Sequence, residues 1–112
     1  MTYDGAHRGE VWTWAGKGEY AKPRPVLVVQ SDRFPTDSVI VALLTSDLID
    51  APLLRVRITP SETNGLERVS DVMVEKITVT DRARLRDRIG ALDETDMVKI
   101  NRALVTVLGI AA

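Results

Sequence analysis

The sequence contains no cysteine, a single histidine and few aromatic residues, only 4% of the chain. Without cysteine the chain can form neither disulfides nor thiolate zinc sites, and it has no thiolate nucleophile. The histidine, His7, lies near the N-terminus in a segment expected to fray, so histidine-based acid–base pairs and metal clusters are not expected. The carboxylates are scattered along the chain. We therefore predict a protein that needs no metal ion and no other cofactor.

Long apolar runs and a strong net charge are also missing. No apolar run approaches the roughly 20 residues that a membrane span requires, and the N-terminus lacks the apolar stretch of a secretory signal. We therefore expect a cytoplasmic protein with no membrane partner. The formal net charge is -1, which argues against a protein that coats nucleic acid by bulk electrostatic attraction. Any RNA binding is then expected to be local.

What the sequence does contain is the composition of an ordinary folded domain. With 112 residues, 45% of them apolar and 28% charged, the chain is long enough for one hydrophobic core and too short for two. We predict a single domain over residues 1–112, without repeats or low-complexity tracts.

Short β-rich segments separated by turn residues fill most of the chain. The run Val26–Val29 is continuously apolar and is expected to be a central strand buried on both faces. The segment Leu54–Ile58 alternates with period 2, which is typical of a half-buried strand with its arginines in solvent. The sequence Asn64-Gly65 is a strong turn signal. The predicted strands are Gly9–Trp14, Val26–Val29, Val39–Leu44, Leu54–Ile58 and one or two within Ser70–Val79.

Only the C-terminal part of the chain has a helical pattern. Apolar residues recur on one helical face from Met97 to Leu108. Asp93 is a suitable N-cap and Gly109 a suitable C′ residue, so the helix is expected over about 94–108. We expect its apolar stripe to cover the open end of the β body or to form part of a homodimer interface. The predicted fold is a mainly β, small barrel of five to seven strands with a C-terminal α-helix.

Eight blocks of residues, each weakly specific, occur in the order and approximate spacing of one known family. The blocks are Arg8–Trp12, Gly18–Glu19, Arg24–Asp32, Val41–Ser46, Gly65–Leu66 with Ser70, Val74–Ile77, Asp81–Leu85 and Ile89–Gly90. On these blocks the chain resembles the MazF/PemK toxins over nearly its whole length. The resemblance implies an SH3-like barrel of the CcdB/MazF type, a homodimer and a cognate antitoxin of a type II toxin–antitoxin system. It also implies a sequence-specific, metal-independent endoribonuclease, an mRNA interferase that cleaves single-stranded RNA.

The resemblance also implies a catalytic set. The family's active-site arginine falls on Arg24, its hydroxyl residue on Thr45, and an acid of the loop between the first two strands on Glu19. RNA cleavage by attack of the 2′-OH needs a proton acceptor, a donor to the departing oxygen and stabilisation of the phosphoryl charge. The planar fork of Arg24 can bind two phosphate oxygens, Thr45 can donate a hydrogen bond to the same group, and Glu19 is the candidate base.

Several further residues are candidates for RNA contact. Arg82, Arg84, Arg86 and Arg88 recur with period 2, which on a strand would place four cations on one face, whereas a turn near Leu85 would scatter them. Trp12 and Trp14 are expected to project to opposite faces of their strand, one in the core and the other stacking on a base or contacting the antitoxin. The sequence departs from the common family pattern at Lys76 and Thr78, which bears on RNA preference. The predicted RNA-binding residues are Lys17, Lys22, Ser46, Lys76, Arg84 and Arg86.

Two other functions stay open at this point. One is a non-catalytic gyrase poison of the CcdB type, because the end Leu108–Ala112 weakly resembles the Trp-Gly-Ile tail of that protein. The tryptophan is missing, however, and the chain continues past Ile110. The other is a catalytically dead relative that serves as a binding module, against which Glu19, Arg24 and Thr45 argue.

Overall fold

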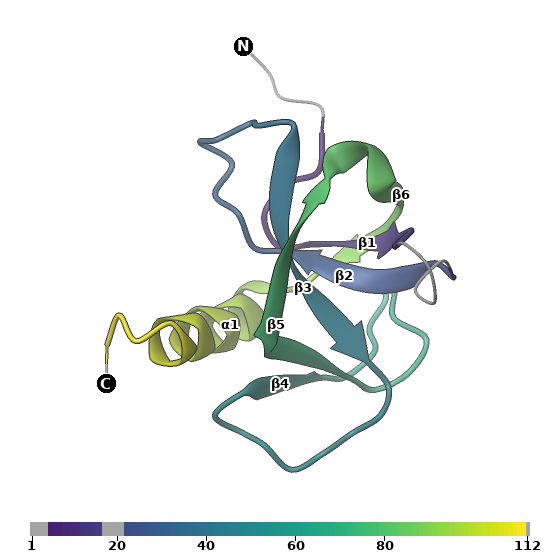
Figure 1. Ribbon diagram of the computed structural model, residues 1–112. Coiled ribbons are helices and arrows are strands. Elements are labelled where there is room, and N and C mark those ends of the chain that lie inside the picture. The colour runs from purple at the N-terminus through teal and green to yellow at the C-terminus, as the bar shows by residue number, and fades with distance from the viewer. Residues whose placement is uncertain (1–4, 17–21, 112) are drawn as a thin grey trace.

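The computed structural model describes residues 5–16 and 22–111. Within these residues the fold is mainly β with a C-terminal helix, as predicted (Figure 1). Lys17 and Glu19, two of the predicted site residues, lie outside the described residues. The elements are β1 Glu10–Trp14, β2 Arg24–Val28, β3 Ser38–Thr45, β4 Arg55–Ile58, β5 Ser70–Asp81, the short 3₁₀ helix η2 Arg82–Arg84, β6 Leu85–Ala91 and α1 Glu94–Val107.

The strands form one antiparallel, six-stranded sheet in the order β4-β5-β3-β2-β1-β6. Its end strands, β4 and β6, do not pair with each other in the described part of the chain, so the hydrogen-bond ladder is open and the barrel is not closed by it. The pairing of β3 with β5 shifts where Ala42 faces Ile77 but Leu43 faces Met73. Residues 74–76 of β5 therefore bulge away from the ladder, and β5 bends along its length (Figure 1).

Apolar residues on the two faces of the sheet form two clusters. Alternate residues of β2 divide between them, since Leu27 belongs to one cluster while Val26 and Val28 belong to the other. We call the cluster that contains Leu27 and Ile100 the helix-side cluster, and the cluster that contains Val26 and Leu85 the tryptophan-side cluster. The whole run 26–29 is buried, which confirms the predicted central strand.

The helix α1 packs against β4 and β5 and covers the part of the helix-side cluster that these two strands contribute. Its buried residues are Ile100 and Ala103. As predicted, the Asp93 side chain accepts a hydrogen bond from the Asp96 backbone N–H, and Gly109 follows the helix with φ +73°. Packing on the β body, the first of the two predicted roles of the helix, is thereby confirmed. Among the described residues, no helix is both long and apolar enough to cross a membrane.

The prediction that Trp12 and Trp14 face opposite sides of β1 is wrong. Both are half-buried and pack against the tryptophan-side cluster, because residues two apart on a strand project to the same face. Each indole N–H has an acceptor within the chain. Trp12 donates to Glu10 (3.2 Å) and Trp14 to Thr80 Oγ1 (2.9 Å).

The four regularly spaced arginines do not form one stripe. Arg82 and Arg84 lie in the 3₁₀ helix and only Arg86 and Arg88 lie on β6. The alternative that a turn near Leu85 scatters the four arginines is therefore the correct one. Arg82 donates to the carbonyl oxygens of Thr36 and Ala6, and Arg84 to that of Ala15. These contacts join the turn to distant segments of the chain.

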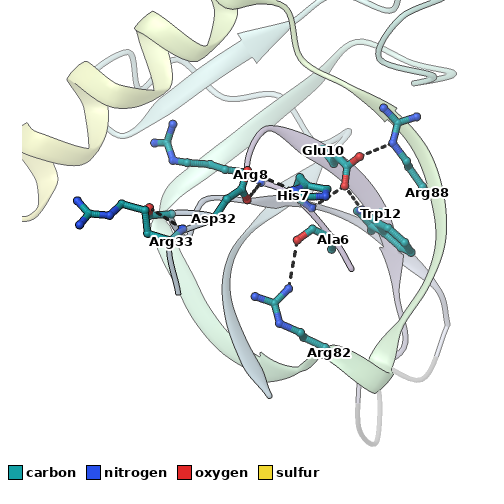
Figure 2. Close-up of polar contacts among 10 residues, drawn as sticks. Ala6, His7, Arg8, Glu10, Trp12, Asp32, Arg33, Arg82 and Arg88 are labelled. Carbon is teal, nitrogen blue, oxygen red and sulfur yellow. Dashed lines mark hydrogen bonds and ion pairs between the residues drawn. The ribbon is translucent and has the colours of Figure 1, made fainter. Parts of the chain in front are cut away.

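The segment before β1 is held by a network of polar contacts, shown in Figure 2. The Arg8 backbone N–H donates to Asp32 (2.8 Å), and Glu10 accepts from the His7 backbone N–H (2.6 Å) and from the side chains of Trp12 and Arg88. Burial acts to raise the pKa of Glu10, but these hydrogen bonds outweigh it and lower the pKa below its ordinary value. The block Arg8–Trp12 therefore has a structural role.

Candidate active site

The ends of two antiparallel strands bring Arg24 and Thr45 together. Arg24 is the first residue of β2 and Thr45 is the last residue of β3. Val26 faces Leu43 in the ladder, and the same register continued by two residues places Arg24 opposite Thr45. Arg24 and Thr45, two of the three residues predicted to be catalytic, therefore lie side by side where β2 begins and β3 ends.

A cleft of about 460 Å³ lies on one side of this pair, and we call it the loop-side cleft. Arg24, Thr45 and Ser46 line it from the sheet. Glu67 and Arg68 line the opposite wall, from the loop between β4 and β5. Asp47 also lines it, so the cleft combines cations, two carboxylates and hydroxyl groups, which suits a charged and hydrogen-bonding ligand.

The loop that forms this wall is fixed to β6 by close backbone approach. Gly65 has φ +69°, and a Cβ there would lie 1.9 Å from the Ile89 carbonyl oxygen. A Cβ on Gly90 would lie 2.3 Å from the carbonyl carbon of Asn64. The buried Asn64 side chain accepts from the backbone N–H groups of Ser61 and Leu66. The wall is therefore preorganised, and only glycine fits at these two positions.

A second hollow of about 380 Å³, the sheet-face groove, lies on the other side of the same pair. Arg24 and Thr45 line both hollows. Trp14, Arg55 of β4 and Lys76 of the β5 bulge also line this groove. An extended chain that crossed the ridge at Arg24 and Thr45 would enter one hollow on each side.

The contacts of Thr45 leave its hydroxyl able to donate into the site. Thr45 Oγ1 accepts a hydrogen bond from the backbone N–H of Asp47 (3.1 Å), which fixes the oxygen, while the hydroxyl proton can still be donated to a ligand. The guanidinium of Arg24, on an exposed residue, supplies a planar set of donors beside it. Together the two side chains can bind and stabilise a tetrahedral oxyanion such as a phosphoryl group.

An ion pair continues the row of residues that contains Thr45. Asp71 of β5 faces both Thr45 of β3 and Arg57 of β4. The hydrogen bond from Arg57 Nε (3.0 Å) is the main cause that lowers the pKa of the buried Asp71 carboxyl. The carboxyl also accepts hydrogen bonds from Arg57 Nη2 (3.3 Å) and from the Ile49 backbone N–H (3.4 Å). Asp71 is therefore held as an ionised structural group and is a poor candidate for a general base.

The predicted site residues are distributed unequally over the structure. Ser46 joins Arg24 and Thr45 in the loop-side cleft, and Lys76 joins them in the sheet-face groove. Lys22 is exposed two residues before Arg24, and Arg86 is exposed on β6. Neither these two nor Arg84 lines either hollow.

Among the residues that line the hollows without having been predicted as site residues are Arg55, Glu67 and Arg68. Arg55 was expected in solvent, which is wrong, because its side chain is only 13% exposed and its Nε lies 3.3 Å from Glu75 Oε2. The alternation of Arg55 with Val56 correctly predicted a strand, but it did not predict that the Arg55 side chain is largely buried. Glu67 and Arg68 follow the Asn64-Gly65 turn, and only that turn signal pointed to an ordered loop there.

No cluster of three or more histidine, cysteine, aspartate or glutamate side chains able to hold a metal ion occurs among residues 5–16 and 22–111. In the loop-side cleft these residues offer the guanidinium groups of Arg24 and Arg68, the hydroxyls of Thr45 and Ser46, and the carboxylates of Asp47 and Glu67.

Comparison with known proteins relates this chain to a family of toxins. A family profile described as PemK-like, MazF-like toxin of type II toxin–antitoxin system matches residues 7–108. A protein named probable endoribonuclease MazF of Mycolicibacterium smegmatis is 51% identical over 106 residues, which cover 93% of this chain and 97% of that protein. Endoribonuclease EndoA of Bacillus subtilis is 37% identical over 90 residues, 78% of this chain and 77% of that protein.

Solved structures show the same fold. An endoribonuclease in complex with its cognate antitoxin, from a mycobacterial species, superposes with a TM-score of 0.82 at 28% identity and covers 96% of this chain and 98% of its own. A MazE–MazF structure from Deinococcus radiodurans has a TM-score of 0.75 at 17% identity, with 95% and 98% of the two chains covered. At that lower identity the likeness concerns the fold alone.

Proposed function

Because the chain belongs to the PemK-like, MazF-like family of toxins of type II toxin–antitoxin systems, we propose that it is a sequence-specific, metal-independent endoribonuclease that cleaves single-stranded RNA. The observation that supports this most is the position of Arg24 and Thr45 on a ridge with a hollow on either side. A phosphate on the ridge would have its two neighbouring nucleotides in the two hollows. The active unit is a single domain over residues 1–112.

The proposed reaction is attack of a ribose 2′-OH on the adjacent phosphorus, which forms a 2′,3′-cyclic phosphate and breaks the bond to the 5′-oxygen. The departing oxygen takes a proton from water and leaves as a 5′-hydroxyl. Arg24 binds the non-bridging oxygens and stabilises the charge that develops on them, and Thr45 donates a hydrogen bond to the same group. Glu19 accepts the proton of the 2′-OH as general base. No metal ion is needed, since the guanidinium supplies the positive charge.

The proposed RNA contacts follow from where the cations lie. Ser46 in the loop-side cleft and Lys76 in the sheet-face groove adjoin the reacting phosphate. Lys17, Lys22, Arg84 and Arg86 would contact the strand farther away, by attraction to its phosphates. Because the net charge is only -1, binding depends on these local groups.

The proposed partners are a second copy of the chain and an antitoxin. The mycobacterial endoribonuclease that superposes on this chain was solved with its cognate antitoxin, which supports a toxin that a bound protein holds inactive. We propose that the protein acts in the cytoplasm. An antitoxin segment that folds on binding would lie along the dimer groove, displace the segment that carries Glu19 and cover Arg24. Hydrogen exchange of the complex tests this, since Arg24 and residues 16–22 should gain protection.

The two other functions predict a different outcome from the same protein. A gyrase poison or a catalytically dead binding module has no use for Arg24 and Thr45 at the junction of two hollows. Neither alternative predicts any cut in RNA, so detection of cleavage by the purified wild type decides against both.

The experiment is cleavage of a long, unstructured RNA by the purified protein in excess EDTA, with fragment ends mapped and Arg24→Ala in parallel. We expect cuts at a short recurring sequence, and a rate lower by about 10²- to 10³-fold for the variant, because one oxyanion-stabilising group is lost. An equal rate for Arg24→Ala would overturn the catalytic assignment. No cleavage by a folded wild type that is still toxic to cells would favour a binding target such as gyrase.

A further inference from the structure

Arg55 is placed in the sheet-face groove in an unusual way for a strand arginine. Its side chain is 13% exposed, yet it lines the groove that Arg24 and Thr45 also line. Its only hydrogen bond to another described residue joins Nε to Glu75 Oε2 at 3.3 Å. The terminal nitrogens therefore have no acceptor in the described part of the chain, and because neither is a buried unsatisfied atom they are accessible to a ligand in the groove.

The β5 bulge sets this arrangement. Met73 faces both Leu43 of β3 and Arg55 of β4, so the three residues form one row across the sheet. The following residues, 74–76, leave the ladder with β3. Glu75 and Lys76 are thereby freed from the regular alternation: Glu75 holds Arg55, and Lys76 reaches the groove. Bulges that re-aim side chains next to a site are common.

The Glu75 carboxylate determines whether a charged or an uncharged ligand binds favourably to Arg55. Its side chain is 24% exposed, and its Oε1 is buried without a hydrogen-bond partner among the described residues. The negative charge is thus compensated chiefly by Arg55, and the pair is close to neutral. A phosphate placed on Arg55 would be repelled by this adjacent carboxylate, whereas an uncharged hydrogen-bonding group would not.

The rest of the groove suits a flat, partly apolar group. Leu43 and Met73 lie beside Trp14 in its lining, and the volume of about 380 Å³ lies in the range of small-molecule sites. The strands of a sheet are about 4.8 Å apart, so β4 lies about 10 Å from β3. Arg55 is therefore within reach of the nucleotide next to a phosphate held by Arg24 and Thr45.

We propose that the sheet-face groove binds the nucleobase adjacent to the scissile phosphate, and that Arg55, oriented by Glu75, reads a base edge with two neighbouring acceptors. This inference rests on the proposed ribonuclease function. Guanine offers such an edge through O6 and N7, and cytosine through N3 and O2, whereas adenine and uracil do not present two adjacent acceptors. Arg55 is thus a specificity-determining residue.

The test compares cut-site preference between wild type and Arg55→Lys on a randomised single-stranded RNA. The lysine keeps the positive charge and loses the fork. At one position beside the cut, we expect the wild type to prefer guanine or cytosine, and Arg55→Lys to reduce that preference by about tenfold. Arg57→Lys is the matched control, because Arg57 lies two residues along the same strand but outside the groove. We expect that control to keep the wild-type preference.

A second arm uses the wild type alone and so does not depend on the folding of a variant. Substitution of 7-deazaguanine or 3-deazacytosine at the preferred position removes one acceptor and should slow cleavage about tenfold. An unchanged rate, a preference for adenine or uracil, or an unchanged preference in Arg55→Lys would overturn the inference. A uniform slowing at all sites by Arg55→Lys would also overturn it, in favour of a phosphate contact. Absence of any cleavage by the wild type would instead overturn the proposed function itself.

Discussion

At the scale of single residues, the Thr45 hydroxyl has its oxygen fixed by the Asp47 backbone N–H and its proton left to donate. We expect Thr45→Val, which has nearly the same shape, to lower kcat about 10²-fold, because a donor to the phosphoryl oxygens is lost in the transition state. The KM should change little if the bond strengthens only in that state. Single-turnover cleavage of a short RNA measures the chemical step directly.

The control for this substitution is Thr45→Ser, which keeps the hydroxyl and loses the methyl group. It should retain most of the activity. If serine were as inactive as valine, the side chain would act through packing at the end of β3 rather than through its hydroxyl.

At the scale of elements, the loop that walls the loop-side cleft depends on its contact with β6. Gly90→Ala would push a methyl group into the backbone of Asn64. Gly65→Ala would push one into the backbone of Ile89 and would also force an alanine to adopt the left-handed φ of +69°. We expect each to destabilise the fold by about 2 to 4 kcal/mol, and to impair RNA cleavage in the fraction that remains folded. Urea unfolding at 25 °C measures the loss.

Gly109→Ala separates the cost of the left-handed backbone from the cost of the steric clash. Its φ is +73°, but a Cβ there would meet nothing within 4 Å. We expect a loss of about 1 kcal/mol from backbone strain alone. If Gly65→Ala cost no more than Gly109→Ala, the loop would be able to lift off β6, and its role as a preorganised wall would be refuted.

Most elements were predictable because their signals are local. The continuous apolar runs predicted β2 and β3. Asp93 and Gly109 predicted the two ends of α1 to within a residue or two. The strand β6 was not assigned, because its outward residues are arginines and an aspartate and only the ends of the segment are apolar. The length of β5 and its bulge were also missed, since they depend on pairing with two different strands.

The candidate site was predictable in part, because the resemblance to the family gave Arg24 and Thr45 as its catalytic residues. Arg24 and Thr45 flank two consecutive antiparallel strands, so the start of one must lie beside the end of the other. The burial of Arg55 was not predictable, because its period-2 pattern is that of a solvent-facing residue and its partner Glu75 lies in the bulge. Glu67 and Arg68 reach the cleft only through the contact of their loop with β6.

At the scale of the whole molecule, two carboxylates make folding stability depend on pH. The pKa of Asp71 is lowered chiefly by the hydrogen bond from Arg57, and that of Glu10 by hydrogen bonds that outweigh its burial. Both groups bind a proton less readily in the folded than in the unfolded chain. Their stabilisation is therefore fully present at neutral pH and is lost as the pH falls below about 4, through the lowered folded pKa values.

We accordingly expect Asp71→Asn to reduce stability by about 1 to 3 kcal/mol at pH 7, and to make the acid dependence shallower. Urea unfolding at a series of pH values between 7 and 2 measures both effects. The exposed Asp87 supplies the control, since Asp87→Asn should leave the curve unchanged. If the free energy of unfolding of Asp71→Asn fell with decreasing pH as steeply as that of the wild type, this ion pair would not be the cause of the loss of stability in acid.

The outer face of α1 bears on assembly. Val98, Val105 and Leu108 are 44%, 36% and 53% exposed and lie on one side of the helix. Such residues favour the proposed homodimer, because a stable interface excludes water from apolar groups near its centre. We expect sedimentation equilibrium to give a wild-type dimer, and Leu108→Glu to shift it to monomer, because the interface would bury an unpaired charge.

Leu53→Glu is the matched control, because Leu53 is 73% exposed but lies in the loop before β4 rather than on α1. A dimer that survives Leu108→Glu and dissociates with Leu53→Glu would place the interface on that loop, next to the sheet-face groove. A wild type that sediments as a monomer at micromolar concentration would refute the homodimer. Cleavage measured over the same concentration range then distinguishes an active monomer from a site that needs both copies, because only the second loses activity per chain as the dimer dissociates.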